Sequence, residues 1–424
     1  MNRKVAIALI SILFGWPASG QSADEPLTLP QCYALALRRS EVVAISEQDI
    51  EKARARFNQA LGEVLPKVSL NFTNLTQDVP PQAQNNSDVG TTFTRRNRPE
   101  LAVRFNQTLF RGLQEITALR LSGSDRALQK YKKADLERLL FQDVATSFYV
   151  IAKIEQDIRT NQMILAVLNG RIKELKERVD LGKNRESELT AQEADTSLVD
   201  ADLEKLKGDR RVAYEALSFL TGLSPHPPIA ATDPLREKLL PVEEYASSSL
   251  ERPDVKADVE SLKLAKGDVK IRYGELLPAA DLEANLYPIR VGFQRDINWD
   301  LFLNVNVPVF NWGSYGRIQE TKASAKQAEL RLVERERIAV NEVRQSYDSF
   351  QSSLRQYRKY GVAVQKSEAS YRGQAEDFSR GLINNLDVLQ SQRTWFQALR
   401  LRDDAKVQSW IDWTLLQVTA GVLP

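Results

Sequence analysis

The 424-residue sequence has very few of the side chains that enzymes use for nucleophilic or metal chemistry, with one cysteine and one histidine. A lone cysteine excludes an internal disulfide, and with a single histidine it excludes a Cys/His zinc site. Any Ser-His-Asp or Cys-His mechanism would depend on His226, which lies in the turn-like run Ser224 to Pro228. We therefore expect no catalytic residues, no metal and no cofactor. His226 is expected to be a loop residue, and Cys32 a small packed side chain.

Neither sign of charge is in excess, because the sequence contains 58 basic and 56 acidic residues. This balance gives no indication of a nucleic-acid partner. Beyond the N-terminus, no run of 18 or more apolar residues occurs. A chain that lacks such a run either leaves the membrane behind or enters one as a β-barrel.

The first 20 residues have the pattern of a secretory signal peptide, cleaved after Gly20. Arg3 and Lys4 precede the apolar run 5–16, and Ala18-Ser19-Gly20 supplies small residues at the expected cleavage site. The alternative is a membrane anchor, but the run is shorter than the ~20 residues that spanning requires. Removing Arg3 and Lys4 leaves 56 basic residues against 56 acidic ones, a net charge of zero.

The remaining chain contains an internal repeat. The run from Leu61 to Pro66 resembles the run from Tyr273 to Pro278 at an offset of 212. Gly182 and Gly222 match Gly381 and Gly421 at an offset of 199. We infer a first repeat over 21–222, a proline-rich linker over 223–241 and a second repeat over 242–424.

A heptad pattern supports the same offset. Apolar residues recur every seven positions from Val144 to Val179, and adding 199 gives a second apolar series from Val343 to Phe378. A sustained seven-residue period predicts a left-handed coiled coil. The alternative is two unrelated amphipathic helices whose phases agree by chance.

Each repeat is predicted to contain the same four parts. A helix over 30–62 or 242–274 comes first, then a β-hairpin over 67–110 or 280–309. A long helix over 113–181 or 314–380 follows, and a shorter helix returns over 187–220 or 387–419. Gly182 and Gly381 are expected to end the long helices, as glycine commonly does. Two shorter helices stacked end to end match the length of one long helix.

The hairpin strands alternate apolar and polar residues, which is typical of a barrel with lipid outside and water inside, and equally of a half-buried hairpin on a soluble domain. Phe72, Phe105, Tyr287 and Trp299 are candidates for an interfacial aromatic girdle, or are lipid-facing or packing residues. Arg95 and Arg96 lie in a long loop over 79–99, which we expect at the outer surface. Four strands are too few to close a barrel, so membrane insertion would require oligomerisation.

This order of elements resembles the TolC outer-membrane efflux protein family over residues 27–422. The resemblance is carried by Leu27-Thr28-Leu29, by the run 62–66, by Pro308 to Gly313, by Gly381 with Asp387-Val388-Leu389, and by Leu416 to Gly421. It implies a mainly α-helical fold with a small β part, in which a trimeric 12-stranded β-barrel continues into a long α-helical coiled-coil barrel. The implied function is an outer-membrane channel extending into the periplasm of a Gram-negative cell. Such a channel is a passive conduit of a tripartite efflux or type I secretion system, for small molecules or polypeptides.

The resemblance also implies site residues and partners. Gly182, Lys183, Gly381 and Leu382 stand at the helix tips that contact a periplasmic adaptor, which links to an inner-membrane pump. Asp387 matches an aspartate of the periplasmic constriction, Gln390 stands where some members have a second one, and Glu188 is the first-repeat counterpart. Asp387 and Glu188 are alternatively acids that favour the N-terminal turn of a helix.

The sequence leaves three alternative functions to consider. A periplasmic adaptor also pairs a signal peptide with a coiled-coil hairpin, but we would expect its β-domains around one helical hairpin. A secreted structural coiled coil leaves four alternating strands unexplained. A hydrolase with a carboxylate pair stays open in principle, although nothing in the sequence indicates a pocket for it.

Overall fold

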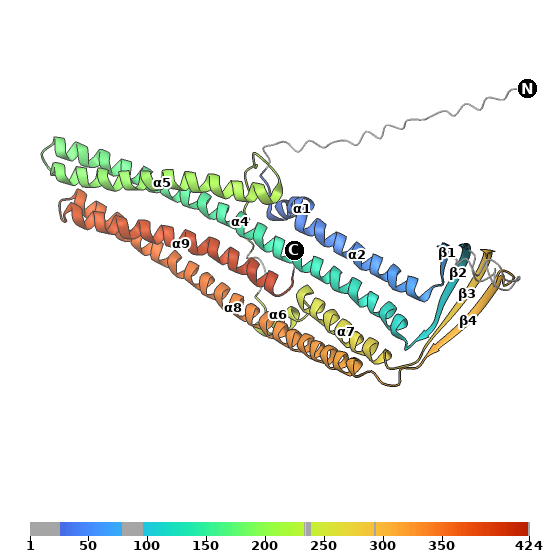
Figure 1. The fold of residues 1–424 in the computed structure, drawn as a ribbon. Coiled ribbons are helices and arrows are strands. Elements are labelled where there is room, and N and C mark those ends of the chain that lie inside the picture. Colours follow the sequence, from blue (N-terminus) through green and yellow to red (C-terminus); the bar gives the residue numbers. More distant parts are fainter. Residues whose placement is uncertain (1–25, 79–95, 233, 235–238, 292–293, 423–424) are drawn as a thin grey trace, which may run out of the picture.

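The computed structural model describes residues 26–78, 96–232, 234, 239–291 and 294–422. The signal peptide and Arg95 lie outside the described residues. The molecule is elongated, with a small sheet at one end and two helical hairpins at the other (Figure 1). Among the described helices, none is both long enough and apolar enough to cross a membrane.

The same order of elements occurs twice along the chain. The first half contains α1 (Leu29–Arg39), α2 (Glu41–Val64), β1 (Lys67–Thr76), β2 (Asn97–Arg111), α4 (Gln114–Asp180) and α5 (Glu186–Thr221). The second half contains α6 (Val242–Ser249), α7 (Pro253–Gly274), β3 (Ala279–Arg290), β4 (Trp299–Asn306), α8 (Trp312–Ser379) and α9 (Asn385–Thr419). In each half the short helices pack along the sheet-proximal part of the long helix and the return helix packs along its distal part (Figure 1).

The single helix expected before each hairpin is wrong, because each is two helices. Ser40 has an extended backbone and its hydroxyl accepts a hydrogen bond from Val43 N–H (3.3 Å), so it ends α1 and caps α2. In the second half, Pro253 begins α7, since proline fits the first helical position but clashes with a helical residue before it. The breaks let the chain bend where the return helices end.

The two halves meet their return helices through equivalent contacts at these breaks. Gly222 and Gly421 both have positive φ, of 76° and 81°. A Cβ at Gly222 would lie 3.1 Å from Cδ of Arg39, and one at Gly421 would lie 3.1 Å from Cγ of Arg252. Arg252 is buried and donates to Asp254, to Glu342 (2.6 Å) and to the carbonyl of Thr419, whereas Arg39 is exposed.

The four strands form one antiparallel sheet in the order β1-β2-β3-β4. The predicted alternation places one continuous apolar surface across all four strands, because Val68 faces Phe105, Val103 faces Leu286 and Ala284 faces Leu301. Side chains on this surface stay open to solvent, as in Phe72 and Trp299, which are 66% and 68% exposed. Strands β1 and β4 are the sheet edges, and within the described residues neither has a second partner strand.

The hairpin loop and one aromatic residue differ from expectation. Strand β2 begins at Asn97, and Gln77 N–H donates to the Arg96 carbonyl (2.9 Å), so the expected loop over 79–99 is shorter. Tyr287 does not share the apolar surface with Phe72, Phe105 and Trp299. The Arg290 guanidinium lies 3.8 Å above its ring and pairs with Glu100 (3.2 Å), which places Tyr287 among polar side chains.

Every position of the predicted heptad series is buried or half-buried in both long helices, but in α4 the fully buried line shifts to neighbouring residues towards the tip. Val343, Phe350, Val364 and Phe378 are buried, and the remaining positions of that series are half-buried. In α4 the expected series is buried only as far as Ile158, after which the fully buried positions are the neighbouring series Ile164, Leu168 and Leu175. A straight α-helix drifts by about 20° per heptad, so the buried line moves to adjacent residues along a 67-residue helix.

The main core lies where α4 passes between the other helices near the middle of the molecule. Phe141, Val144, Phe148 and Ile151 of α4 pack there against α1, α5 and α9. Cys32 is fully buried in this core, which confirms the packing prediction, and burial raises the pKa of its thiol to about 11.

The linker holds the start of the described chain. Leu27 N–H donates to the Pro228 carbonyl and Ala230 N–H to the Leu27 carbonyl, both at 2.8 Å. His226 lies in this loop against the Tyr214 ring, with Nδ1 2.7 Å from the Pro227 carbonyl, and burial lowers its pKa.

Candidate functional site: the helix tips and the joints between helical hairpins

The two helical tips close with the same backbone geometry. Gly182 and Gly381 have φ of 71° and 79°, the left-handed conformation that suits glycine. Gly182 N–H donates to the Val179 carbonyl (2.8 Å) and Lys183 N–H to the Arg178 carbonyl (2.9 Å). The bonds from Gly381 and Leu382 at the second tip repeat this pattern, so both tips are Schellman-type turns. The predicted end of each long helix is confirmed.

Each tip presents a large apolar side chain to solvent. Leu382 is 69% exposed, and two neighbours that the sequence analysis did not single out, Leu181 and Leu386, are 68% and 70% exposed. The sequence did contain one indication of this exposure, because Leu181 directly precedes Gly182, the glycine that was predicted to end the helix. Exposed leucines clustered at the end of a long hairpin form a candidate contact surface.

Asp387 and Gln390 line a polar groove between α8 and α9. They lie one turn apart near the start of α9, and both are exposed. The groove has a volume of about 250 Å³, and its other lining residues are Ser367, Ser370, Gln374, Ser391 and Thr394. Asn384 caps α9 by accepting a hydrogen bond from Asp387 N–H (3.1 Å). The Asp387 carboxylate itself has no hydrogen bond or ion pair within the described residues, which leaves it available at the surface.

Glu188 has a different environment from Asp387. It is half-buried on α5, and Asn184 Nδ2 donates to its Oε2 at 2.7 Å. No hydrogen bond or ion pair in the described part of the chain joins Glu188 to Asp387 or Gln390. Within one chain the three predicted constriction residues therefore lie on two separate helices, with Asp387 and Gln390 together and Glu188 apart.

A buried arginine that the sequence analysis missed joins the two hairpins near their tips. Arg171 of α4 is 4% exposed, and its Nη2 donates to Asn385 Oδ1 at the start of α9 (2.8 Å). Its guanidinium also lies 4.4 Å from the ring centroid of Phe378, while Arg178 lies 4.6 Å from the same centroid. Both guanidinium groups belong to the first half of the chain and Phe378 to the second, so these cation–π contacts connect the two halves.

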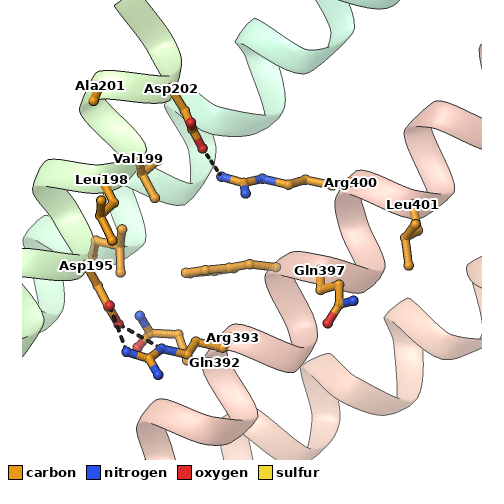
Figure 2. Close-up of a pocket in the computed structure, with 12 residues that line it drawn as sticks. Asp195, Leu198, Val199, Ala201, Asp202, Gln392, Arg393, Gln397, Arg400 and Leu401 are labelled. Atoms are coloured by element: carbon orange, nitrogen blue, oxygen red, sulfur yellow. Dashed lines mark hydrogen bonds and ion pairs between the residues drawn. The ribbon is translucent and has the colours of Figure 1, made fainter.

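Further from the tips, α5 and α9 face each other across a groove of about 710 Å³ (Figure 2). Arg393 of α9 pairs with Asp195 of α5 through two hydrogen bonds (2.8 and 3.0 Å), and Arg400 approaches Asp202 at 3.6 Å. Between these ion pairs, Leu198 and Val199 point into the groove, and Leu168 of α4 also lines it. The ion pairs fix the spacing of the two return helices.

An acidic cluster lies at the next joint, where α4 contacts α9. Asp403 is 3% exposed and accepts hydrogen bonds from Thr160 (2.6 Å) and Gln156 (3.2 Å). The neighbouring Asp157 is partly buried, and burial with the charges of Asp404 and Asp403 raises its pKa to about 6. This joint therefore carries a carboxyl group that titrates in the mildly acidic range.

The clusters described above are ion pairs, hydrogen-bonded joints and cation–π contacts between helices. Within the described ranges, no group of three or more histidine, cysteine, aspartate or glutamate side chains is placed to bind a metal ion. What the arrangement offers is two parallel coiled-coil hairpins held together by polar joints, attached to a sheet with one apolar surface.

Comparisons with known proteins agree with this architecture. Residues 245–421 match the family model described as outer membrane efflux protein. The outer membrane efflux protein BepC of Brucella suis is 23% identical over 405 residues, which is 92% of this chain and 84% of BepC. The alkaline protease secretion protein AprF of Pseudomonas aeruginosa is 24% identical over 185 residues, 41% of this chain and 37% of AprF.

The fold is also that of solved channel proteins. The outer membrane protein VceC of Vibrio cholerae superposes with a TM-score of 0.81 at 17% identity, covering 93% of this chain and 96% of VceC. A periplasmic adaptor, the alternative function, is not favoured by these matches. Residues 245–421 thus match the outer membrane efflux protein family, and over most of its length the chain is similar to an outer-membrane efflux protein.

Proposed function

We propose that three copies of this outer-membrane channel protein assemble into one conduit. Their sheets join into a 12-stranded β-barrel in the outer membrane, and their helices continue as an α-helical coiled-coil barrel through the periplasm. The conduit is passive and exports small molecules or polypeptides. The relatives include one named for efflux and one named for protease secretion, and both kinds of cargo suit an open lumen.

The observation that carries this proposal is the four-stranded sheet with two free edges and one apolar surface. Unpaired edge groups in lipid are costly, so a sheet that enters a membrane must close on itself. Four strands cannot close, whereas three copies joined β4 to β1 supply twelve. The apolar surface then faces lipid and the polar surface, with its Arg290–Glu100 ion pair, faces the lumen.

We further propose that the chain consists of the signal peptide 1–20, the repeats 21–222 and 242–424, and the linker 223–241. The matching glycine–arginine contacts at Gly222 and Gly421 support one duplicated unit. A duplicated unit gives the trimer six similar helical units around its axis.

The helix tips are proposed to contact a periplasmic adaptor that connects the conduit to an inner-membrane pump. Gly182 and Gly381 shape the two turns, while Lys183 and Leu382 are exposed beside them. Two similar tips in each chain give six in a trimer, an arrangement that suits a ring of adaptor hairpins. Exposed leucines supply the apolar contact that such docking requires.

We propose that Asp387 forms the periplasmic constriction, with Gln390 beside it and Glu188 in a minor role. Support comes from the exposed, unpaired carboxylate of Asp387 in a polar groove. Three copies would place three carboxylates around one aperture, and such a ring favours cations. Glu188 is held by Asn184, so it is less free to line a pore.

The test is the mass of the protein extracted from outer membranes, measured by light scattering with correction for bound detergent. We expect about three times the mass of the mature chain, because four strands per chain need partners to close. A monomer or dimer that remains in solution without detergent would overturn the conduit and favour an adaptor or a structural coiled coil.

A further inference from the structure

Two flanks of the molecule carry apolar side chains that no other described element covers. On the outer side of α5, Val212 and Phe219 are 71% and 83% exposed, and Ile45 of α2 is 61% exposed. On the outer side of α8, Leu330 and Val362 are 57% and 49% exposed. These flanks lie at opposite sides of the chain, with α4, α7 and α9 between them (Figure 1).

The contact between α4 and α9 within the chain shows how the flanks of α5 and α8 could pack against each other. Helices α4 and α9 run antiparallel, and Tyr149 lies against Trp410 with ring centroids 6.2 Å apart. Two turns further along, Gln156 and Thr160 donate to Asp403. In the pairs Tyr149–Trp410 and Gln156–Asp403 the residue numbers add to 559. The other polar contacts between α4 and α9 have sums from 556 to 563, so 559 is the central register of the joint.

The corresponding register between the two uncovered flanks follows when each residue is replaced by its counterpart in the other repeat. Adding 199 moves α4 onto α8, and subtracting 199 moves α9 onto α5, as Gly182/Gly381 and Gly222/Gly421 require. The sum of 559 is unchanged, so Tyr149–Trp410 becomes Asp348 against Arg211. Gln156–Asp403 becomes Arg355 against Glu204. Aromatic and polar pairs inside the chain thus become pairs of opposite charge between the two flanks.

The charge pattern is consistent along the whole register. Between α8 and α5, five positions bring two charged residues together, and all five pairs have opposite signs: Arg344–Glu215, Asp348–Arg211, Arg355–Glu204, Lys359–Asp200 and Lys366–Glu193. All ten residues are exposed. In the described chain, Glu204 is the one among them with an ion pair, to Lys207 on its own helix. Charge complementarity of this kind fixes register and rejects wrong pairings.

We propose that α8 of one copy packs against α5 of the next copy in the register defined by these five pairs. The inference rests on the proposed trimer and specifies the interface that closes it. A contact between two different flanks is heterologous, and such contacts form a ring when the rotation closes. The joint between chains then repeats the joint within the chain, with ion pairs in place of the Tyr149–Trp410 contact.

Cysteine cross-linking of the full-length protein in its membrane tests the register. Thr160 lies one turn beyond Gln156 and also donates to Asp403 (2.6 Å), so Lys359, one turn beyond Arg355, should likewise lie beside Glu204 of the next copy. The variant carrying Lys359→Cys and Glu204→Cys should form disulfide-linked dimers and trimers on mild oxidation, because short side chains in contact meet disulfide geometry. The matched control pairs Lys359→Cys with Glu215→Cys, eleven residues away along α5 or about 16 Å. It should stay monomeric on non-reducing gels, as should each single variant, since Cys32 is buried.

Charge-reversal variants test the same register without introducing cysteine. Asp348→Arg and Arg211→Asp should each lower the temperature at which the trimer dissociates, and the double variant should recover most of the loss. If light scattering finds a trimer but Lys359/Glu204 does not cross-link and the double variant recovers nothing, the register is wrong while the trimer stands. If the unmodified protein is not a trimer, the proposed function itself fails.

Discussion

At the residue scale, the informative side chains are charged groups placed where helices meet, and most were invisible to pattern analysis. Asp387 and Glu188 occupy equivalent helix starts, yet the first is exposed and the second is bound by Asn184. Arg171 and Arg252 were not singled out because an arginine in a charged helix looks solvated. Only the neighbours that bury them to 4% and 2% exposure reveal their roles.

The proposed constriction makes a prediction for Asp387. Replacing it by alanine removes three carboxylates from the aperture of a trimer, so single-channel conductance in planar bilayers should rise and the preference for cations should fall. Glu188→Ala is the matched control and should change both properties much less, because that carboxylate is held by Asn184. Equal effects of the two substitutions would contradict the proposal that Asp387 lines the constriction.

Asp157 makes a prediction about pH. Its pKa in the folded protein is raised to about 6 from the ordinary aspartate value of 3.8, so between these pH values the folded state holds a proton that the unfolded state releases. Stability therefore increases as pH falls through 6, and at pH 8 the charged Asp157 is destabilising. Asp157→Asn should raise the melting temperature at pH 8 and have little effect at pH 4.5, measured by thermal unfolding in detergent. A gain of the same size at both pH values would contradict this account.

At the element scale, the helices follow local sequence closely at their ends and less closely in their interiors. Glycine at Gly182 and Gly381 defines the tips, because a positive φ costs other residues free energy whatever surrounds them. The break at Ser40 was missed, although serine is a strong capping residue and the polar run Arg38-Arg39-Ser40-Glu41 interrupts the apolar pattern there. In α4, the buried line left the predicted heptad because a helix of that length drifts against a fixed period.

The tip turns can be tested with alanine. Gly182→Ala and Gly381→Ala should each destabilise the local turn by about 1–2 kcal/mol, since a Cβ in the left-handed conformation is strained. Hydrogen exchange of the tip amides should accelerate accordingly. Gly170→Ala and Gly373→Ala are suitable controls, because both sites are helical and, apart from the adjacent residues and the backbone of the same helix, no described atom lies within 4 Å of the new Cβ. They should be neutral or slightly stabilising, and faster exchange in all four variants would argue against the backbone explanation.

At the scale of the whole molecule, the fold leaves several apolar surfaces uncovered by other described elements. Exposed apolar side chains occur on one surface of the sheet, on both flanks and at the tips, each where the proposed assembly meets lipid, another copy or an adaptor. The polar joints at Arg393–Asp195 and Arg171–Asn385 hold the two hairpins of one chain at a fixed spacing. The chain therefore presents preformed surfaces to its partners.

The duplication, the order of the elements, the tips and the alternating strands could all be predicted from the sequence, because they depend on local periodicity and on the chemistry of glycine, serine and proline. The sequence also indicated the family. The tertiary structure decided which charges meet: Arg171 with Asn385, Arg252 with Glu342, and Asp157 beside Asp403. It also decided that both hairpins join into one sheet through β2 and β3. These contacts link residues up to some 250 positions apart, and their energies depend on burial and distance, which no local pattern encodes.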